Sequence, residues 1–203
     1  MVDTVLRVAY FVILFASEAI RAPHRARNSR DRLRRNVADT RVAGLETALM
    51  TLAFVGMWVV PALYVFTPWF AFADYGLPVP VRIALGVLGA GAGILGLWLL
   101  VRAHADLGRN WSPSLEIKRE QALVTGGVYR YVRHPIYAAM WLLMLAQALL
   151  LQNAIGGLAG LAVYLPTYLL RVPREERMMV EHFGEAYRRY MERTGRVVPR
   201  LGR

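Results

Sequence analysis

The sequence predicts an all-α integral membrane protein with about five transmembrane helices, a cytoplasmic catalytic segment and an amphipathic C-terminal helix. The chain of 203 residues is 56% hydrophobic and has a mean hydropathy of +0.34, yet it carries a net charge of +11. Soluble domains do not combine these properties. The apolar residues form blocks that approach the roughly 20 residues needed to cross about 30 Å of hydrocarbon. The arginines cluster between these blocks.

The charges between the blocks predict the topology. Residues 67–80 and the turn at 152–153 contain no Lys or Arg, whereas residues 21–43, the central stretch 107–137 and the tail from 171 are rich in them. Cytoplasmic loops carry the excess of positive charge, so five crossings place the amino terminus outside and the other basic segments on the cytoplasmic side. Because the arginines flank apolar spans, this pattern favours membrane lipid as a partner and disfavours nucleic acid.

The N-terminal part, residues 1–101, is expected to contain three spans. The first span is interrupted by Asp3, Arg7 and Glu18, and we interpret it as a retained helix that lies partly in the interface. The basic loop 21–43 that follows it is assigned no catalytic role. The expected spans of the whole chain are 2–20, 44–66, 81–101, 135–151 and 154–170.

Two of these spans carry residues with a clear structural purpose. Gly89 and Gly93 form a small-xxx-small pair inside an apolar helix, which predicts close helix packing and makes a phosphate-binding loop improbable. Pro135 suits a first helical turn, because proline lacks the amide hydrogen that would be unsatisfied there. Residues 173–193 repeat apolar side chains at helical spacing and predict one amphipathic helix.

The central stretch and the tail together carry the candidate chemistry. Arg171 and Glu175 are one helical turn apart at the point where the fifth span ends. A cation can hold a carboxylate, a carboxylate can hold a cationic group, and aromatic rings can surround an onium centre. The chain has no cysteine, no His-x-x-x-His and no nucleophile elbow, so we expect neither a metal site nor hydrolysis. The remaining polar and aromatic candidates are Trp111, Tyr129, Tyr131, Arg133, His134 and Tyr137.

Four strings in the second half resemble the isoprenylcysteine carboxyl methyltransferase family and its bacterial, phospholipid methyltransferase-like relatives. They are LGRNWSP, QALVT, GVYRYVRHPIYAAMW and RVPREERMMVEHFGEAYRRYMERTGRVVPRL, within residues 107–201. The resemblance implies an integral membrane methyltransferase, most simply a carboxyl O-methyltransferase, that uses S-adenosyl-L-methionine without a Rossmann domain. Residues 102–203 then form a methyltransferase-like catalytic half with a cofactor loop, a helical hairpin and the C-terminal helix.

The resemblance also implies the roles of individual residues. Arg171, Glu175 and His134 are the expected catalytic residues, with Arg171 holding the carboxylate of a lipophilic methyl acceptor. That acceptor enters between helices, whereas the cofactor enters from the cytoplasm. The expected cofactor contacts are Gln121, Leu123, Val124, Tyr129, His134, Pro135, Tyr137 and Glu175.

Several alternatives stay open at this point. The acceptor atom can belong to a hydrophobic carboxylate, a lipid amine or a small thiol, and the last two would make His134 or a tyrosine a candidate proton acceptor. A membrane reductase that uses NADPH is one rival function, because some sterol reductases share a similar C-terminal half. A non-enzymatic membrane protein is the other.

Overall fold

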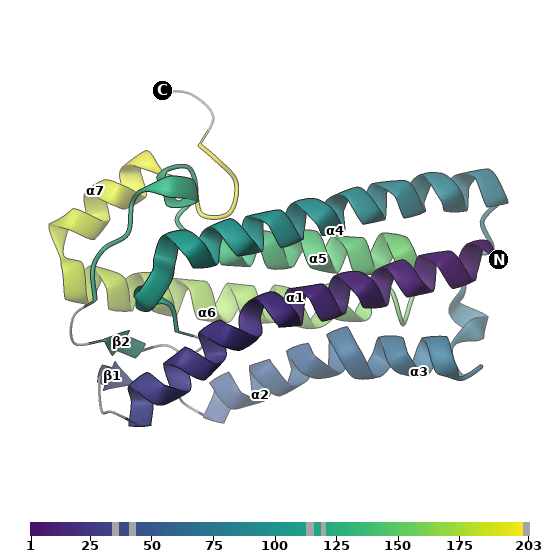
Figure 1. Ribbon diagram of the computed structural model, residues 1–203, viewed down its shortest axis with the longest axis horizontal. Coiled ribbons are helices and arrows are strands. Elements are labelled where there is room, and N and C mark those ends of the chain that lie inside the picture. Colours follow the sequence, from purple (N-terminus) through teal and green to yellow (C-terminus); the bar gives the residue numbers. More distant parts are fainter. Residues whose placement is uncertain (34–36, 41–43, 113–115, 119–120, 201–203) are drawn as a thin grey trace.

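The computed structural model describes residues 1–33, 37–40, 44–112, 116–118 and 121–200. Its longer helices lie side by side along one axis, with the amino terminus at one end and α7 and the strand pair at the other (Figure 1). We call the latter the polar end. The elements are α1 (Val2–Leu33), β1 (Val37–Thr40), α2 (Gly44–Phe54), η1 (Val55–Val59), α3 (Val60–Phe66), η2 (Ala71–Ala73), α4 (Val79–Leu107), η3 (Gly108–Asn110), β2 (Glu116–Lys118), η4 (Gly127–Arg130), α5 (Pro135–Leu151), α6 (Ala159–Phe183) and α7 (Glu185–Arg193).

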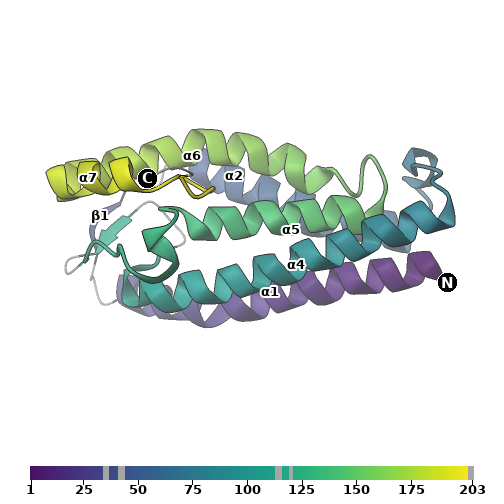
Figure 2. The same cartoon turned by 90° about the horizontal axis from the view of Figure 1, so that it is seen from above.

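The core lies where α5 packs between α4 and α6, as the view from above shows (Figure 2). Close packing depends on the glycines of α4. A Cβ added at Gly96 would stand 3.2 Å from the carbonyl oxygen of Ala139 in α5, and one added at Gly89 would meet Leu149 and Leu150. Gly93 faces Ile13 of α1 in the same way. The small residues therefore let α4 approach both neighbours, as predicted.

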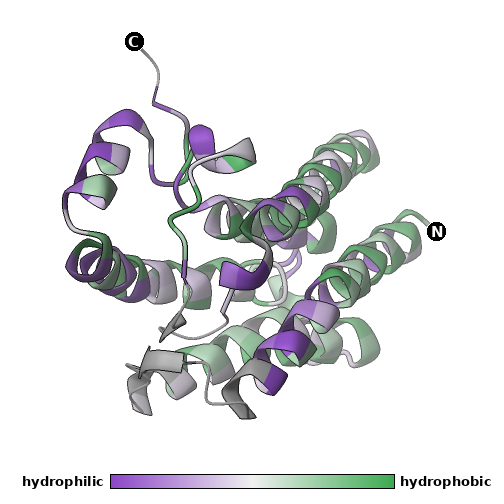
Figure 3. Cartoon of the chain, turned by 60° about the vertical axis from the view of Figure 1, so that its left-hand side comes forward, coloured by the Kyte–Doolittle hydropathy of each residue, from purple (hydrophilic) through white to green (hydrophobic). Residues whose placement is uncertain are grey.

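Within the part of the chain that the structure describes, two helical segments are long and apolar enough to cross a membrane by length and composition, Thr47–Phe66 and Val79–Asn110, and Pro135–Leu151 is a shorter apolar helix. The outer face of α4 exposes large apolar side chains, among them Leu88, Ile94 and Trp98. Hydrophilic residues gather at the polar end, whereas the bodies of the helices are mostly hydrophobic (Figure 3). This distribution is typical of a helical bundle that faces lipid along its sides.

Several predicted boundaries were wrong. The helix expected over 81–101 is α4, Val79–Leu107, and the span expected from 154 begins as α6 at Ala159. The basic loop expected from residue 21 begins later, because α1 continues to Leu33, and Glu18 pairs with Arg21 at 3.0 Å and with Arg25 on this part of the helix. The expected fifth span does not end at 170, because α6 continues through Pro173 to Phe183. The single amphipathic helix expected over 173–193 is divided at Gly184, whose φ of +56° favours glycine and ends α6 before α7 begins.

A short antiparallel pair of strands was not predicted. Val37 pairs with Lys118 and Thr40 with Glu116, which joins the segment after α1 to the central stretch. The register shifts between Val37 and Asp39. Apart from this pair, the described part of the chain is helical or irregular, which confirms a predominantly helical fold.

The two connections that lack Lys and Arg meet at the end opposite the polar end. The amide of Asn153 donates to the Asp74 carboxylate at 2.8 Å and to the carbonyl oxygen of Phe70 at 2.7 Å. The hydroxyl of Tyr64 donates to the same carboxylate at 2.8 Å. These contacts tie residues 67–78 to the turn between α5 and α6, so the two connections share one side of the bundle.

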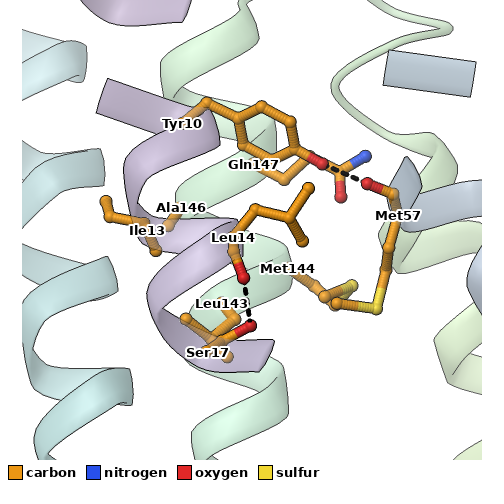
Figure 4. Close-up of a pocket in the computed structure, with 9 residues that line it drawn as sticks. All are labelled: Tyr10, Ile13, Leu14, Ser17, Met57, Leu143, Met144, Ala146 and Gln147. Atoms are coloured by element: carbon orange, nitrogen blue, oxygen red, sulfur yellow. Dashed lines mark hydrogen bonds between the residues drawn. The ribbon is translucent and has the colours of Figure 1, made fainter. Parts of the chain in front are cut away.

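A polar side chain stabilises an irregular turn inside the bundle. At η1 the second span forms a π-helical turn, which leaves backbone groups without their usual helical partners. Gln147 of α5 donates to the carbonyl oxygen of Gly56 in this turn at 3.0 Å and to that of Gly156 at 2.9 Å. The Tyr10 hydroxyl donates to the Met57 carbonyl oxygen. These side chains border a small pocket between α1, α5 and η1, with room for about one water molecule (Figure 4).

Replacing Gln147 by leucine should lower the stability of the protein by roughly 1–3 kcal/mol, because two buried carbonyl oxygens lose their donor. The measurement is the thermal unfolding midpoint of the protein in detergent, followed by tryptophan fluorescence. Leu145→Ala, on the exposed face of the same helix, is the matched control and should change the midpoint much less. Equal midpoints for Gln147→Leu and wild type would contradict this role.

Candidate active site

The segment before α5 is held by the end of the chain. The backbone N–H of Arg133 donates to the carbonyl oxygen of Gly195 at 2.9 Å, and that of His134 to the carbonyl oxygen of Arg196 at 2.9 Å. Gly195 has no room for a Cβ, because the carbonyl oxygen of Val198 faces it. Pro135 then begins α5, as its missing N–H predicts. The returning C-terminal segment therefore fixes the backbone from which the candidate side chains project.

Glu176 is the buried centre of the charges at the polar end. Its side chain is only 5% exposed and accepts a hydrogen bond from Arg133 Nε at 2.6 Å and from Arg196 Nη2 at 2.7 Å. The Nε2 atom of His134 lies 3.3 Å from Glu176 Oε1. Arg133 also donates to the carbonyl oxygen of Thr194 at 2.6 Å. One carboxylate of α6 therefore joins the start of α5 to the C-terminal segment, and we call these four side chains the Glu176 cluster.

The Glu176 cluster makes stability dependent on pH. Burial alone would raise the pKa of Glu176, but hydrogen bonds from His134, Arg133 and Arg196 outweigh it and lower the pKa from 4.5 to about 2. A carboxyl group whose pKa is lower in the folded state stabilises the fold above its unfolded pKa. That contribution, on the order of 3 kcal/mol, is lost as the pH falls from about 4.5 toward 2.

We therefore expect the thermal unfolding midpoint of the wild-type protein to decrease as the pH is lowered below 4.5. The Glu176→Gln variant should lack the part of this decrease that comes from protonation of Glu176. Thermal unfolding in detergent between pH 3 and pH 7 measures this difference. The neutral glutamine binds no proton in this range, so it serves as the control. Parallel pH profiles of the two proteins would contradict the assignment of the low pKa to Glu176.

Glu175, next to this carboxylate, faces a different set of side chains. Its Oε2 accepts a hydrogen bond from the Tyr137 hydroxyl at 2.8 Å, and its Oε1 lies 3.9 Å from His134 Nδ1. The rings of His134 and Tyr137 meet edge to face, with centroids 5.5 Å apart. The Glu175 side chain keeps 30% of its surface exposed, in contrast to that of Glu176. Glu175 is therefore the carboxylate that a ligand can reach.

Arg171 lies one turn before Glu175 on α6. Tyr164 lies seven residues earlier on the same side of this helix. Tyr164 also donates to the carbonyl oxygen of Tyr137 at 3.2 Å. The structure thus brings four predicted residues, Arg171, Glu175, His134 and Tyr137, to the junction of α5 and α6.

The predicted cofactor loop lies at the same end and is tied down by neighbouring elements. Tyr129 is buried in η4, and its carbonyl oxygen accepts a hydrogen bond from Tyr190 of α7 at 2.6 Å. Gln121 Nε2 lies 4.0 Å from the sulfur of Met179 in α6. Leu123 and Val124 are half-buried between these two anchors. The structure therefore places the described part of this loop beside α6 and α7, at the same end as Glu175.

Sequence reasoning missed several residues that hold this arrangement. Glu176 and Arg196 were not candidates, although two consecutive glutamates at the end of a span were a usable signal. Adjacent helical residues point about 100° apart, so the two carboxylates serve different partners. Two further anchors hold the loop: Asp106 accepts from the Val128 N–H at 2.8 Å, and Asn110 accepts from the Ala122 N–H at 2.9 Å.

No cluster of three metal-ligating side chains occurs among the residues that the structure describes, so the site is built from charge pairs, tyrosines and one histidine. A bundle of apolar helices with a polar site at one end is typical of a helical membrane protein. The model of the phospholipid methyltransferase family matches residues 84–186, and the chain belongs to this family.

Two curated proteins that are similar to this chain are both described as protein-S-isoprenylcysteine O-methyltransferases. The chain is 32% identical over 107 residues to a protein-S-isoprenylcysteine O-methyltransferase of Schizosaccharomyces pombe. The matched region covers 52% of this chain and 45% of that protein. It is 33% identical over 108 residues to protein-S-isoprenylcysteine O-methyltransferase B of Arabidopsis thaliana, with 52% and 55% covered. The chain spans about half the length of the curated relatives it matches.

A solved structure is similar over a larger part of the chain. It is that of the eukaryotic intramembrane Ras methyltransferase, isoprenylcysteine carboxyl methyltransferase. The TM-score is 0.52 at 26% sequence identity, with 78% of this chain and 54% of that chain covered. The similarity therefore reaches into the N-terminal helices, where the family model does not match.

Proposed function

We propose that this protein is an integral membrane methyltransferase that transfers the methyl group of S-adenosyl-L-methionine to the carboxylate of a lipophilic acceptor. The observation that carries the proposal is the junction of α5 and α6, where Glu175, Tyr137 and His134 lie in contact and Arg171 stands one turn away. All four residues fall within the segment that the family model matches. The isoprenylcysteine O-methyltransferases among the relatives favour a carboxylate as the acceptor group.

The proposed topology has five crossings with the site on the cytoplasmic face. Support comes from the arrangement of the connections: the two without Lys or Arg are hydrogen-bonded together at one end of the bundle. The basic segments gather at the other end, where the candidate site lies. The excess of positive charge at this end fits the positive-inside rule, and Arg82 near the opposite end is paired with Asp3. A cytoplasmic cofactor would then reach the site directly.

The residues at the junction fit S-adenosyl-L-methionine. When bound, this cofactor supplies an electrophilic methyl group on a positively charged sulfonium. Glu175 offers a partly exposed carboxylate to positive charge, and the ring of Tyr137 beside it offers an aromatic face. We propose that Gln121, Leu123, Val124 and Tyr129 line the rest of the cofactor site, with His134 and Pro135 at its α5 side.

The acceptor requires orientation more than activation. A carboxylate is ionised at neutral pH, so no strong general base is needed, and Arg171 would hold it in line with the cofactor. The position of His134 supports this choice. Its Nε2 lies 3.3 Å from Glu176 Oε1 and its Nδ1 lies 3.9 Å from Glu175 Oε1, so both ring nitrogens face carboxylates of the protein. A proton acceptor for an amine or a thiol would need one nitrogen turned toward the substrate.

Methyl transfer to N-acetyl-S-farnesyl-L-cysteine tests the proposal. The purified protein in lipid nanodiscs is incubated with methyl-labelled S-adenosyl-L-methionine, and the product is treated with base. A methyl ester releases labelled methanol, whereas a methylated amine or thiol does not. We expect base-labile product, and Arg171→Ala should reduce its formation by raising the KM for the acceptor. Absence of base-labile product would refute a carboxylate acceptor, and reduction of an alkene in a parallel incubation with NADPH would favour the reductase.

A further inference from the structure

Two polar side chains hold the loop 121–128 where α4 ends, at the polar end of the bundle (Figure 1). Asp106 Oδ2 accepts a hydrogen bond from the backbone N–H of Val128 at 2.8 Å. Asn110 Oδ1 accepts one from the backbone N–H of Ala122 at 2.9 Å. Both acceptors are side-chain oxygens, and both donors belong to the loop backbone. The loop is therefore held near each of its ends, and we call these two contacts the α4 clamp.

The loop backbone fits closely against Asp106. Gly127 has a φ of +59°, a conformation that favours glycine, and a Cβ added there would clash with the Asp106 carboxylate. Glycine at this position therefore provides both the backbone conformation and the room for the carboxylate. The other oxygen of this carboxylate lies 3.8 Å from Arg102 Nη2, whose side chain is 52% exposed. One oxygen of Asp106 thus serves the loop, and the other faces an exposed cation.

Hydrogen bonds connect the α4 clamp to the segment that carries His134. The carbonyl oxygen of Val128, whose N–H Asp106 holds, accepts from the N–H of Tyr131 at 3.2 Å and from that of Val132 at 3.4 Å. The next two N–H groups along the chain, those of residues 133 and 134, donate to the C-terminal segment at 2.9 Å. The backbone before α5 is therefore fixed from two sides, by α4 at its start and by the C-terminal segment at His134.

We propose that Asp106 and Asn110 are positioning residues, which hold the loop in the conformation that receives the adenosyl cofactor. This inference rests on the proposed function, in which the loop lines the cofactor site. Leu123 and Val124 lie between the two N–H groups that the α4 clamp holds, so their backbone is constrained from both directions. A loop that is ordered beforehand loses less conformational entropy when a ligand binds, so the clamp raises the affinity for the cofactor. Asp106 acts through the N–H of Val128.

Two variants disrupt the same hydrogen bond from opposite sides. Asp106→Ala removes the acceptor, whereas Gly127→Ala places a methyl group where the carboxylate lies. Each should raise the Kd for S-adenosylhomocysteine, measured by calorimetric titration, by roughly fivefold to tenfold. In the transfer assay, each should raise the KM for S-adenosyl-L-methionine and leave the KM for N-acetyl-S-farnesyl-L-cysteine unchanged. Asn110→Ala should raise the same Kd by releasing the other end of the loop.

Two further variants and one further measurement separate positioning from general stability. Arg102→Ala removes the exposed partner of the same carboxylate and should bind S-adenosylhomocysteine as the wild-type protein does. Asp106→Asn keeps an oxygen that can accept from the Val128 N–H, so it should recover most of the affinity that Asp106→Ala loses. Hydrogen exchange of the amides of the loop should be faster in Asp106→Ala and Gly127→Ala, but not in Arg102→Ala. Thermal unfolding midpoints show that each variant is folded.

Wild-type affinity for S-adenosylhomocysteine in both Asp106→Ala and Gly127→Ala would overturn the inference and leave the proposed function intact. An equal loss of affinity in Arg102→Ala, or no recovery in Asp106→Asn, would also overturn it, because the effect would then not depend on the hydrogen bond to the loop. A folded wild-type protein that binds no adenosyl ligand would instead refute the proposed function, and the inference with it. The two failures are therefore distinguished by the titration of the wild-type protein.

Discussion

Glu176→Ala is expected to destabilise the protein by about 3–5 kcal/mol, because removing one partner of a buried charge cluster leaves the others buried and unpaired. Arg133, whose side chain is 9% exposed, and His134, at 4%, would lose their common carboxylate. The C-terminal segment would also lose its attachment to α6 through Arg196. The measurement is the thermal unfolding midpoint in detergent, with the near-ultraviolet circular dichroism of the aromatic cluster as a second probe.

Two neighbouring variants control this experiment. Arg196→Gln removes a partner whose side chain is 46% exposed, so solvent screens the loss and the destabilisation should be under about 1 kcal/mol. Glu175→Ala removes the adjacent carboxylate, which approaches the Glu176 cluster at 3.9 Å from His134 Nδ1 and leaves the bonds to Glu176 in place, so its midpoint should stay near the wild-type value. A midpoint for Glu176→Ala no lower than that of Glu175→Ala would show that Glu176 is not the structural centre of the site.

Glu175→Ala should weaken the binding of S-adenosylhomocysteine by roughly 10- to 100-fold, since a hydrogen bond to a charged group is worth about 1.5–3 kcal/mol. The variant loses the exposed carboxylate and releases the Tyr137 hydroxyl, which donates to it at 2.8 Å. Calorimetric titration of the detergent-purified protein measures the affinity. Retention of wild-type affinity in this folded variant would remove Glu175 from the cofactor site.

Three further variants separate the contributions. Tyr137→Phe keeps the ring and removes only the hydroxyl, so it should cost less affinity than Glu175→Ala. Arg171→Ala should leave the affinity for the cofactor nearly unchanged and lower the affinity for the methyl acceptor. His134→Ala should also lower the affinity for the cofactor. Because His134 faces both glutamates, the unfolding midpoint of this variant must be compared with that of Glu176→Ala before the change in affinity is assigned to the site.

The helices were predictable because apolar length and proline position are local signals. The helix predicted at 135–151 was confirmed to the residue, since Pro135 starts α5 and Gln152 ends it in a left-handed conformation. The boundaries at 21 and 170 were not found, because polar composition does not stop a helix whose charges pair along it, as Glu18 does with Arg21. The pairing of β1 with β2 joins segments far apart in the sequence, which no local pattern reveals.

The candidate site was predictable only in part, for a similar reason. Arg171 and Glu175 are one turn apart, so their spacing places them on one face, and the structure brings Glu175 to Tyr137 and His134. The Glu176 cluster joins the segment before α5, α6 and the C-terminal segment. Arg133 is 43 residues from Glu176 and 61 residues from Thr194, to which it also donates. No spacing rule connects them. The second half of α1 was missed because its arginines resembled those of a loop.

The central claim is that the junction of α5 and α6 holds an adenosyl cofactor. Titration of the wild-type protein with S-adenosyl-L-methionine, S-adenosylhomocysteine and NADPH, followed by calorimetry, tests it most directly. The account predicts saturable, one-to-one binding of both adenosyl ligands that is weakened in Glu175→Ala, with no binding of NADPH. A folded sample that binds neither adenosyl ligand would contradict the account, and saturable binding of NADPH alone would replace the methyltransferase with the reductase.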